Sequence, residues 1–173
     1  TSETTSETTS ETTSETTSET TSYDSPAGGT YNVTEYSEKT ESTEVTYTKS
    51  GTSITCVSTE GDVETTTVYT KSGDSYTATV NEEDATSTLD SDVETMLSSS
   101  VVFETDNTCM LGERSGTYTV SDSTCTVVIV EDNESWEFTT TDGWVTISCS
   151  WESTNNNNDD DTTTTCIMTF TRQ

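Results

Sequence analysis

The alternation of apolar and hydroxyl side chains in short runs is the feature that most limits what this chain can fold into. From about residue 30 onward, β-branched and aromatic residues recur at every second position, usually with Thr or Ser between them. Turn-forming pairs such as Ser50-Gly51, Gly61-Asp62 and Asp142-Gly143 interrupt these runs. Because a period of two places alternate side chains on opposite faces of a strand, the pattern predicts an all-β antiparallel fold.

The strand pattern is clearest in eight segments, each followed or preceded by turn residues. They are Ser53–Ser58, Thr65–Thr70, Ser75–Val80, Thr117–Val120, Thr124–Val130, Ser135–Thr139, Trp144–Trp151 and Thr164–Thr171. An antiparallel meander of about eight to ten strands removes its exposed edges most simply by closing on itself. We therefore expect an up-and-down β-barrel.

One segment, Glu82–Ser98, has a helical pattern instead. Its apolar residues recur at spacings of three and four, and acidic residues stand near its start, where they favour a helix N-terminus. These apolar residues are Ala85, Leu89, Val93, Met96 and Leu97. We expect one short helix that acts as a lid on the barrel.

The alternation also predicts which side chains face inward. The expected core residues are Cys125, Val127, Ile129, Trp136, Phe138, Val145, Ile147, Cys149, Trp151, Cys166, Met168 and Phe170. Six aromatic residues have two interpretations, since they either pack as a plain core or line a ligand cavity; they are Trp136, Trp144, Trp151, Phe103, Phe138 and Phe170. Packing in the core is the usual fate of aromatic residues on alternating strands.

Residues 1–22 repeat the tetrapeptide Thr-Ser-Glu-Thr and contain no apolar side chain. Such a segment cannot bury a core, and its hydroxyl density is typical of O-glycosylated stalks, although an unmodified disordered tail is the alternative. The only Pro and a Gly pair follow, which divides the chain into a stalk (1–22), a linker (23–29) and a β-barrel domain (30–173). The O-glycosylation candidates are Thr4, Thr5, Ser6, Thr8, Thr9, Ser10, Thr12, Thr13, Ser14, Thr16, Thr17 and Ser18.

The charge of the chain argues against several classes of partner. It has 33 acidic and 5 basic residues, which gives a net charge of −28. This charge repels nucleic-acid phosphates and anionic lipids, and no run of 18 apolar residues predicts a membrane span. We expect a processed, secreted protein of the extracellular surface that binds no nucleic acid and does not insert into a membrane.

The chain contains no His, the residue that most often serves in general acid–base catalysis. Acidic neighbours such as Glu82-Glu83 and Asp159-Asp160-Asp161 are expected from composition alone in so acidic a chain. We therefore expect a protein that is not an enzyme, with no catalytic residues and no cofactor. A carboxylate-based enzyme is the remote alternative.

Five cysteines lie on strand-like segments without the Cys-x-x-Cys spacing of zinc or redox motifs. Disulfides fit an extracellular protein better, with Cys149–Cys166 as the first candidate pair and Cys109–Cys125 as the second. Cys56 then remains, either buried or bonded to another chain. The connectivity is open, because an odd number of cysteines leaves at least one thiol unpaired.

Two further patterns concern modification and ion binding. Asn32-Val-Thr34 and Asn133-Glu-Ser135 match the N-glycosylation acceptor pattern, so Asn32 and Asn133 are candidates. The run from Asn155 to Asp161 supplies oxygen atoms of the kind that Ca²⁺ binds, but it lacks EF-hand spacing. A solvated hairpin loop is the stronger interpretation of this run, and no metal site is assigned.

Residues Val101 to Gln173 resemble the lipocalin-like domains of bacterial surface and secreted proteins. The resemblance rests on Gly116-Thr-Tyr-Thr-Val-Ser-Asp-Ser-Thr-Cys125, which looks like that family's Gly-x-Tyr-x-Val turn and strand, and on the closing segment Met168–Gln173. It implies an up-and-down barrel, often with a cavity for an apolar ligand. The tetrapeptide repeat is similar to heavily glycosylated repeat proteins that form extracellular fibres.

Together these features predict a structural extracellular glycoprotein, a self-assembling subunit of a surface fibre or matrix, with an O-glycosylated stalk. Its expected partners are identical copies of itself, in a homo-oligomer or filament. The repeat could pair with a neighbouring barrel by strand addition. The alternative is a monomeric lipocalin-like protein that binds a small ligand and is tethered by a flexible stalk.

Overall fold

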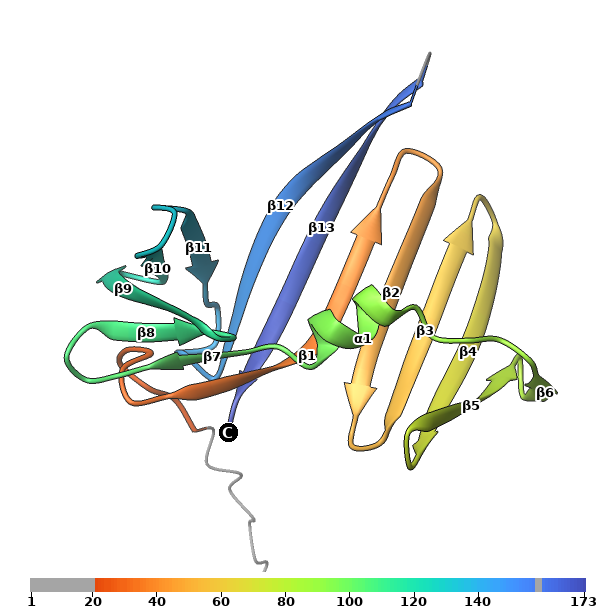
Figure 1. The fold of residues 1–173 in the computed structure, drawn as a ribbon, viewed down its shortest axis with the longest axis horizontal. Coiled ribbons are helices and arrows are strands. Elements are labelled where there is room, and N and C mark those ends of the chain that lie inside the picture. The colour runs from red at the N-terminus through yellow and green to blue at the C-terminus, as the bar shows by residue number, and fades with distance from the viewer. Residues whose placement is uncertain (1–20, 158–159) are drawn as a thin grey trace, which may run out of the picture.

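A computed structural model describes residues 21–157 and 160–173 (Figure 1). Within these residues the chain forms thirteen strands and one short helix, in agreement with the predicted all-β class. In chain order the elements are β1 (Thr30–Lys39), β2 (Thr43–Ser50), β3 (Ser53–Glu60), β4 (Val63–Ser72), β5 (Ser75–Val80), β6 (Glu83–Ala85), α1 (Ser91–Leu97), β7 (Ser100–Phe103), β8 (Thr108–Leu111), β9 (Arg114–Ser121), β10 (Thr124–Ile129), β11 (Ser135–Thr139), β12 (Thr146–Asn157) and β13 (Asp160–Arg172).

Eight of the strands, β1 and β7–β13, close into an antiparallel barrel, which confirms the predicted fold class. The ring closes at β1, because Tyr31 of that strand pairs with Val101 of β7 on one side and with Arg172 of β13 on the other. Strands β7–β13 supply seven of the eight barrel strands, and β1 supplies the eighth. The antiparallel barrel predicted from the sequence is therefore present.

The remaining strands form an open extension of the sheet. Strands β3, β4 and β5 coincide with predicted strands, but we expected them in the barrel wall and not outside it. We call this extension, made of β2–β6 with Glu35–Lys39 of β1, the wing (Figure 1). The pairing of β1 with β13 shifts register between Val33 and Glu35, and such a bulge bends a strand. One strand can therefore begin in the barrel wall and continue into the wing.

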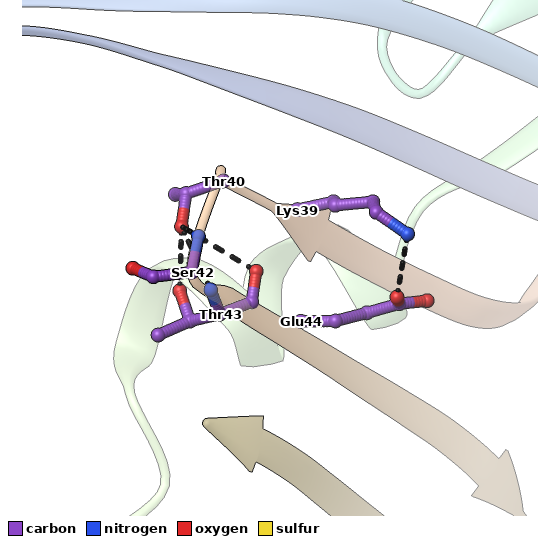
Figure 2. A network of polar contacts seen from close by, with 5 residues as sticks. All are labelled: Lys39, Thr40, Ser42, Thr43 and Glu44. Carbon is purple, nitrogen blue, oxygen red and sulfur yellow. Dashed lines mark hydrogen bonds and ion pairs between the residues drawn. The ribbon is translucent and has the colours of Figure 1, made fainter. Parts of the chain in front are cut away.

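Hydroxyl side chains help to make the hairpin turn between β1 and β2 (Figure 2). Thr40 Oγ1 lies 2.8 Å from Thr43 Oγ1 and accepts a hydrogen bond from the Thr43 amide at 3.1 Å. Just outside the turn, Lys39 Nζ lies 2.8 Å from Glu44 Oε2. Short polar side chains favour turns because they bond to nearby backbone groups, which explains how so Thr-rich a sequence specifies tight hairpins.

Aromatic rings fill the interior of the barrel. Phe103 is fully buried and makes edge-to-face contacts with Tyr31, Tyr118 and Phe138, at ring-centroid distances of 5.7, 4.9 and 6.2 Å. Phe138 meets Phe170 at 5.7 Å. Edge-to-face contacts of this kind add to the stabilisation that burial provides. The interpretation of these aromatics as core therefore describes Phe103, Phe138 and Phe170 well.

The helix is shorter than predicted, and the prediction is wrong over its first part. Asn81 and Glu82 have positive φ angles of 48° and 72° and form a turn, after which Glu83–Ala85 pairs with β5 as the strand β6. Helix α1 begins only after Asp90, whose Oδ1 accepts a hydrogen bond from the Asp92 amide at 2.7 Å as an N-cap.

Helix α1 covers one face of the wing and does not close the barrel as a lid. The Lys49 ammonium group on β2 donates to the Leu97 carbonyl at the end of the helix, at 2.8 Å. Glu94 accepts from Lys71 on β4 at 2.7 Å and from Tyr76 on β5 at 3.0 Å. These contacts reach the helix from three wing strands, so the helix and the wing form one unit.

The predicted inward faces are largely confirmed, with one local error. Eight of the expected core residues are buried: Cys125, Val127, Ile129, Phe138, Ile147, Cys149, Cys166 and Phe170. Trp136, Trp151 and Met168 are half-buried against the core. Trp144 has a φ of +60°, which reverses the alternation before β12, so Trp144 is buried and Val145 is only half-buried.

Candidate assembly surface

Strand β12 has an outer edge that, within residues 21–157 and 160–173, is unpaired over most of its length. On one side it pairs with β13 from Thr146 to Asn157, whereas on the other side its pairing with β11 is limited to Thr139 opposite Ser148. Beyond this pair, β11 and β12 diverge (Figure 1). The barrel wall is therefore closed between β11 and β12 at one end only, and β12 continues past the closure as an edge strand.

The register shows which backbone groups this edge exposes. The Arg172 amide donates to the Val145 carbonyl at 2.9 Å, so odd-numbered residues of β12 bond to β13. Because hydrogen-bonding directions alternate along an antiparallel strand, the backbone groups of Ser150, Glu152 and Thr154 point away from β13. A row of outward N–H and C=O groups is a template for another strand.

Two tryptophans bridge the inner side of the opening between β11 and β12. The rings of Trp136 and Trp151 meet edge to face at a centroid distance of 5.7 Å. Tyr36 stacks on Trp151 at 6.2 Å, and Tyr47 stacks on Tyr36 at 6.3 Å. Trp136 Nε1 is buried without a hydrogen-bond partner, which is unusual for a buried polar atom.

The hydroxyl of Tyr36, in the middle of this stack, stays protonated and donates a hydrogen bond. Burial, together with hydrogen bonds to Glu38 and Cys166, raises the pKa of Tyr36 well above its usual range. The Tyr36 hydroxyl donates to Glu38 Oε1 at 2.6 Å and lies 3.7 Å from Cys166 Sγ. The aromatic row next to the β12 edge therefore has a fixed orientation.

The free edge of the wing, strand β6, is protected against pairing with another strand, whereas the β12 edge is not. Strand β6 has three residues, pairs with β5 from Glu83 to Ala85, and exposes the acidic side chains of Glu83 and Asp84. Short edge strands that carry charge resist pairing with other strands. The β12 edge instead carries Ser150, Glu152 and Thr154, so it holds a single charge over this stretch.

The linker predicted for residues 23–29 packs against the base of the barrel. The Arg172 guanidinium lies 3.7 Å from the centre of the Tyr23 ring and donates to the carbonyls of Ser25 and Ala27 at 3.1 and 3.2 Å. The Tyr23 amide donates to the carbonyl of Gly143 at 2.6 Å, and Pro26 is fully buried. The repeat therefore leaves the domain from a fixed point.

All five cysteines are buried free thiols in the structure. Cys149 and Cys166 do lie on the same face of adjacent strands, but they are diagonal neighbours, since Cys149 faces Met168 and Cys166 faces Trp151. Burial raises the pKa of Cys125 and of Cys149 to about 12, so these thiols stay protonated at neutral pH. The pairs Cys149–Cys166 and Cys109–Cys125 stay predictions.

The modification candidates fall in different parts of the chain. The O-glycosylation candidates between Thr4 and Ser18 lie outside the described residues. Asn32 is exposed on β1, and Asn133 is exposed in the turn between β10 and β11 with a φ of +58°. Nothing in the structure tests whether these residues carry sugars.

The Asn/Asp run that could bind Ca²⁺ lies where the hairpin of β12 and β13 turns, and residues 158–159 in it are outside the described part of the chain. Among the side chains that the structure describes, no group of three or more His, Cys, Asp or Glu residues is placed to hold a metal ion. In the same described part, no helix has the length and hydrophobicity needed to cross a bilayer.

The sequence did not point to the short pairing between β11 and β12 or to the contacts of Arg172 with the linker. Alternation predicts that Ser135–Thr139 and the segment from Trp144 to Trp151 are strands, but not that their pairing stops after one residue pair. Arg172 is one of only five basic residues, and this rarity could have indicated that it has a structural role.

Comparisons with protein-family models, with curated proteins and with solved structures found no match.

Proposed function

We propose that this protein is a structural subunit of the extracellular surface whose copies assemble through their β-sheets, with the Thr/Ser repeat as an O-glycosylated stalk. One observation carries the proposal: strand β12 has a long edge whose backbone groups at Ser150, Glu152 and Thr154 point away from β13 and have no partner strand among the described residues. An edge of this kind is a site for strand addition by another chain.

The filled interior favours assembly over ligand binding as the role of the barrel. A small-molecule site is a concave pocket that encloses its ligand. Here Phe103, Phe138 and Phe170 occupy the middle of the barrel, and a ligand would have to displace their packed rings. The monomeric ligand-binding alternative therefore has no observation in its favour, and it enters as an outcome of the test.

The charge of the protein determines the conditions under which assembly should occur. Each copy carries a net charge of −28, so copies repel one another at low ionic strength. Salt screens exposed charges over a Debye length of about 10 Å at 0.1 M. Assembly should therefore strengthen as salt is raised, and sugars on the stalk would keep the assembled copies hydrated.

The test is the intact mass of material from the native source, before and after chemical deglycosylation, together with electron microscopy of the same sample. A mass above the 18.7 kDa of the bare chain that falls on deglycosylation, with filaments or sheets in the micrographs, is the expected result. Single particles with the mass of the bare chain would overturn the proposal and return attention to ligand binding.

A further inference from the structure

We infer that the edge of β12 receives the Thr-Ser-Glu-Thr repeat of a neighbouring copy as an added antiparallel strand. This inference rests on the proposed function, because it names the partner through which the copies assemble. The receiving site is the outward edge from Ser150 to Thr154, beside the Trp136–Trp151 ring contact that joins β11 to β12. The occupant is a segment within residues 1–20, which lie outside the described part of the chain.

The edge is an accessible receptor for a strand. Strand β12 keeps its full ladder to β13 as far as Asn157, so it is held in an extended conformation without help from β11. Natural edge strands usually carry Lys, Pro or inward charges that block pairing. Among Ser150–Thr154, Glu152 is the single charged residue, and no Pro or Lys is present.

The repeat has the alternation that this site requires. In an extended chain, even-numbered positions of residues 1–20 carry only Ser and Thr, and odd-numbered positions carry Thr and Glu. Burying an unpaired carboxylate is costly, so the Ser/Thr face turns toward the tryptophans and the Thr/Glu face toward water. Sugars on outward threonines such as Thr5 and Thr9 would then point into solvent.

The buried indole nitrogen of Trp136 provides a second, independent reason for a polar occupant. This N–H group lacks a partner, and an unsatisfied buried donor costs free energy. A hydroxyl oxygen can accept from it, and the inward face of the repeat presents one hydroxyl at every second residue. Because this nitrogen is buried in the isolated subunit, the Trp136 ring would have to turn toward the edge for the added strand to satisfy the donor.

Charge limits the register of the added strand. Glu152 lies on the outward face of the sheet, next to odd-numbered positions of the repeat, and like charges directly opposite each other are destabilising. Glu152 therefore faces a Thr of the repeat rather than a Glu. Because Glu recurs at every fourth position, the allowed registers differ by steps of four residues.

The repeat leaves the domain at the base of the barrel, where Arg172 contacts Tyr23, Ser25 and Ala27. Figure 1 places this base at the opposite end of the β12–β13 hairpin from its tip, and the open part of the edge lies toward that tip. At roughly 3.3 Å per residue the extended repeat could reach the edge of its own copy as well as that of a neighbour. The neighbour is chosen because the proposed function requires contacts between copies, and such a head-to-tail contact builds filaments.

Two full-length variants, unglycosylated and studied by sedimentation velocity, test the two halves of the contact. Ser150→Pro with Thr154→Pro removes outward amide donors from the edge without touching the ladder to β13, and Ser150→Ala with Thr154→Ala is its control. The second variant, Thr4→Glu with Thr8→Glu, Thr12→Glu and Thr16→Glu, places charge on the inward face of the repeat. Its control is Thr5→Glu with Thr9→Glu, Thr13→Glu and Thr17→Glu, which has the same composition and net charge. Both glutamate variants also carry Glu152→Gln, so that no Glu of the repeat meets a like charge on the edge.

The expected result is complementation. The wild-type chain and both controls self-associate, each of the two variants alone is monomeric, and an equimolar mixture of the two forms a one-to-one dimer. That dimer joins the intact repeat of the proline variant to the intact edge of the glutamate variant.

Other outcomes separate the two proposals. Self-association of the proline variant to the wild-type extent would overturn the β12 edge as receptor and leave the proposed function standing. Equal behaviour of the inward and outward glutamate variants would overturn the repeat as the added strand. A wild-type chain that stays monomeric at every protein and salt concentration would overturn the proposed function itself. No dimer in the mixture would overturn the contact between copies.

Discussion

Single side chains in the barrel interior carry a large share of its stability. Phe103 has no exposed surface and touches three other aromatic rings. Phe103→Ala should lower the free energy of unfolding by about 3–5 kcal/mol, since it leaves a cavity that the rigid barrel cannot fill. Urea denaturation measures this change. Val120→Ala, on an exposed face of β9, is the control, and equal losses in the two variants would contradict a packed interior.

Asp142 should make stability depend on pH. Partial burial raises the pKa of its carboxyl, but hydrogen bonds from the amide and hydroxyl of Thr146, at 2.9 and 2.7 Å, outweigh this and hold the pKa below its usual value. A lowered pKa in the folded state gives stability that is present above the unfolded pKa of about 3.9 and lost as pH falls through the folded value.

Thermal unfolding midpoints between pH 5 and pH 2 should therefore fall more steeply for the wild-type chain than for Asp142→Asn. Asp74→Asn, in the exposed turn between β4 and β5, is the control and should keep the wild-type slope. If Asp142→Asn also keeps that slope, the hydrogen bonds to Thr146 do not stabilise the loop before β12.

At the scale of elements, the wing should depend on its helix while the barrel does not. Leu97 is buried at the end of α1, and its carbonyl accepts from Lys49 of β2. Leu97→Ser should destabilise the wing by about 2–4 kcal/mol, the range for removing a large buried apolar side chain. Hydrogen exchange should then rise in β3 and β4 and stay low in β10 and β13.

Ser91→Ala, at an exposed position of the same helix, serves as the control for Leu97→Ser and should leave both regions protected. Equal loss of protection in the barrel and in the wing would show that the two unfold as one cooperative unit. That result would contradict the description of the wing as a separate extension.

The strands of the barrel could be predicted because their alternation is local. Cys125, Val127 and Ile129 follow one another at a period of two, and all three are buried. Three wing strands, β3, β4 and β5, coincide with predicted strands, but their place outside the barrel could not be predicted, because it follows from the register shift in β1 between Val33 and Glu35 and from the pairing of β1 with β2. Pairings between distant strands, such as β1 with β13, leave no local pattern in the sequence.

The prediction of the helix was wrong, and the candidate site was not predicted, for different physical reasons. Ala85 and Leu89 are half-buried, so their spacing imitates a helical face, but positive φ angles at Asn81 and Glu82 make a turn that commits Glu83–Ala85 to a strand. The edge of β12 is free because its pairing with β11 ends after Thr139 and Ser148. The absence of hydrogen bonds beyond this pair cannot be inferred from residue composition, so the candidate site was found only from the strand register.

At the scale of the whole molecule, the two ends of the sheet differ in a way that suits directional assembly. The β6 end is short and acidic, whereas the β12 end is long and nearly uncharged. Tyr23 is held at the base of the barrel beside Arg172, so in the proposed assembly each copy would give a strand from one place and receive one at another. Contacts of this type extend into filaments rather than closing as dimers.

The most direct measurement is residue-resolved hydrogen exchange in the full-length chain as its concentration is raised. If copies join through the β12 edge, the amides of Ser150, Glu152 and Thr154 exchange fast in dilute solution and become protected on assembly. The amides of Cys149, Trp151 and Ser153, which bond to β13, should be protected throughout and serve as the internal reference. Fast exchange at Ser150, Glu152 and Thr154 in an assembled sample would contradict the account.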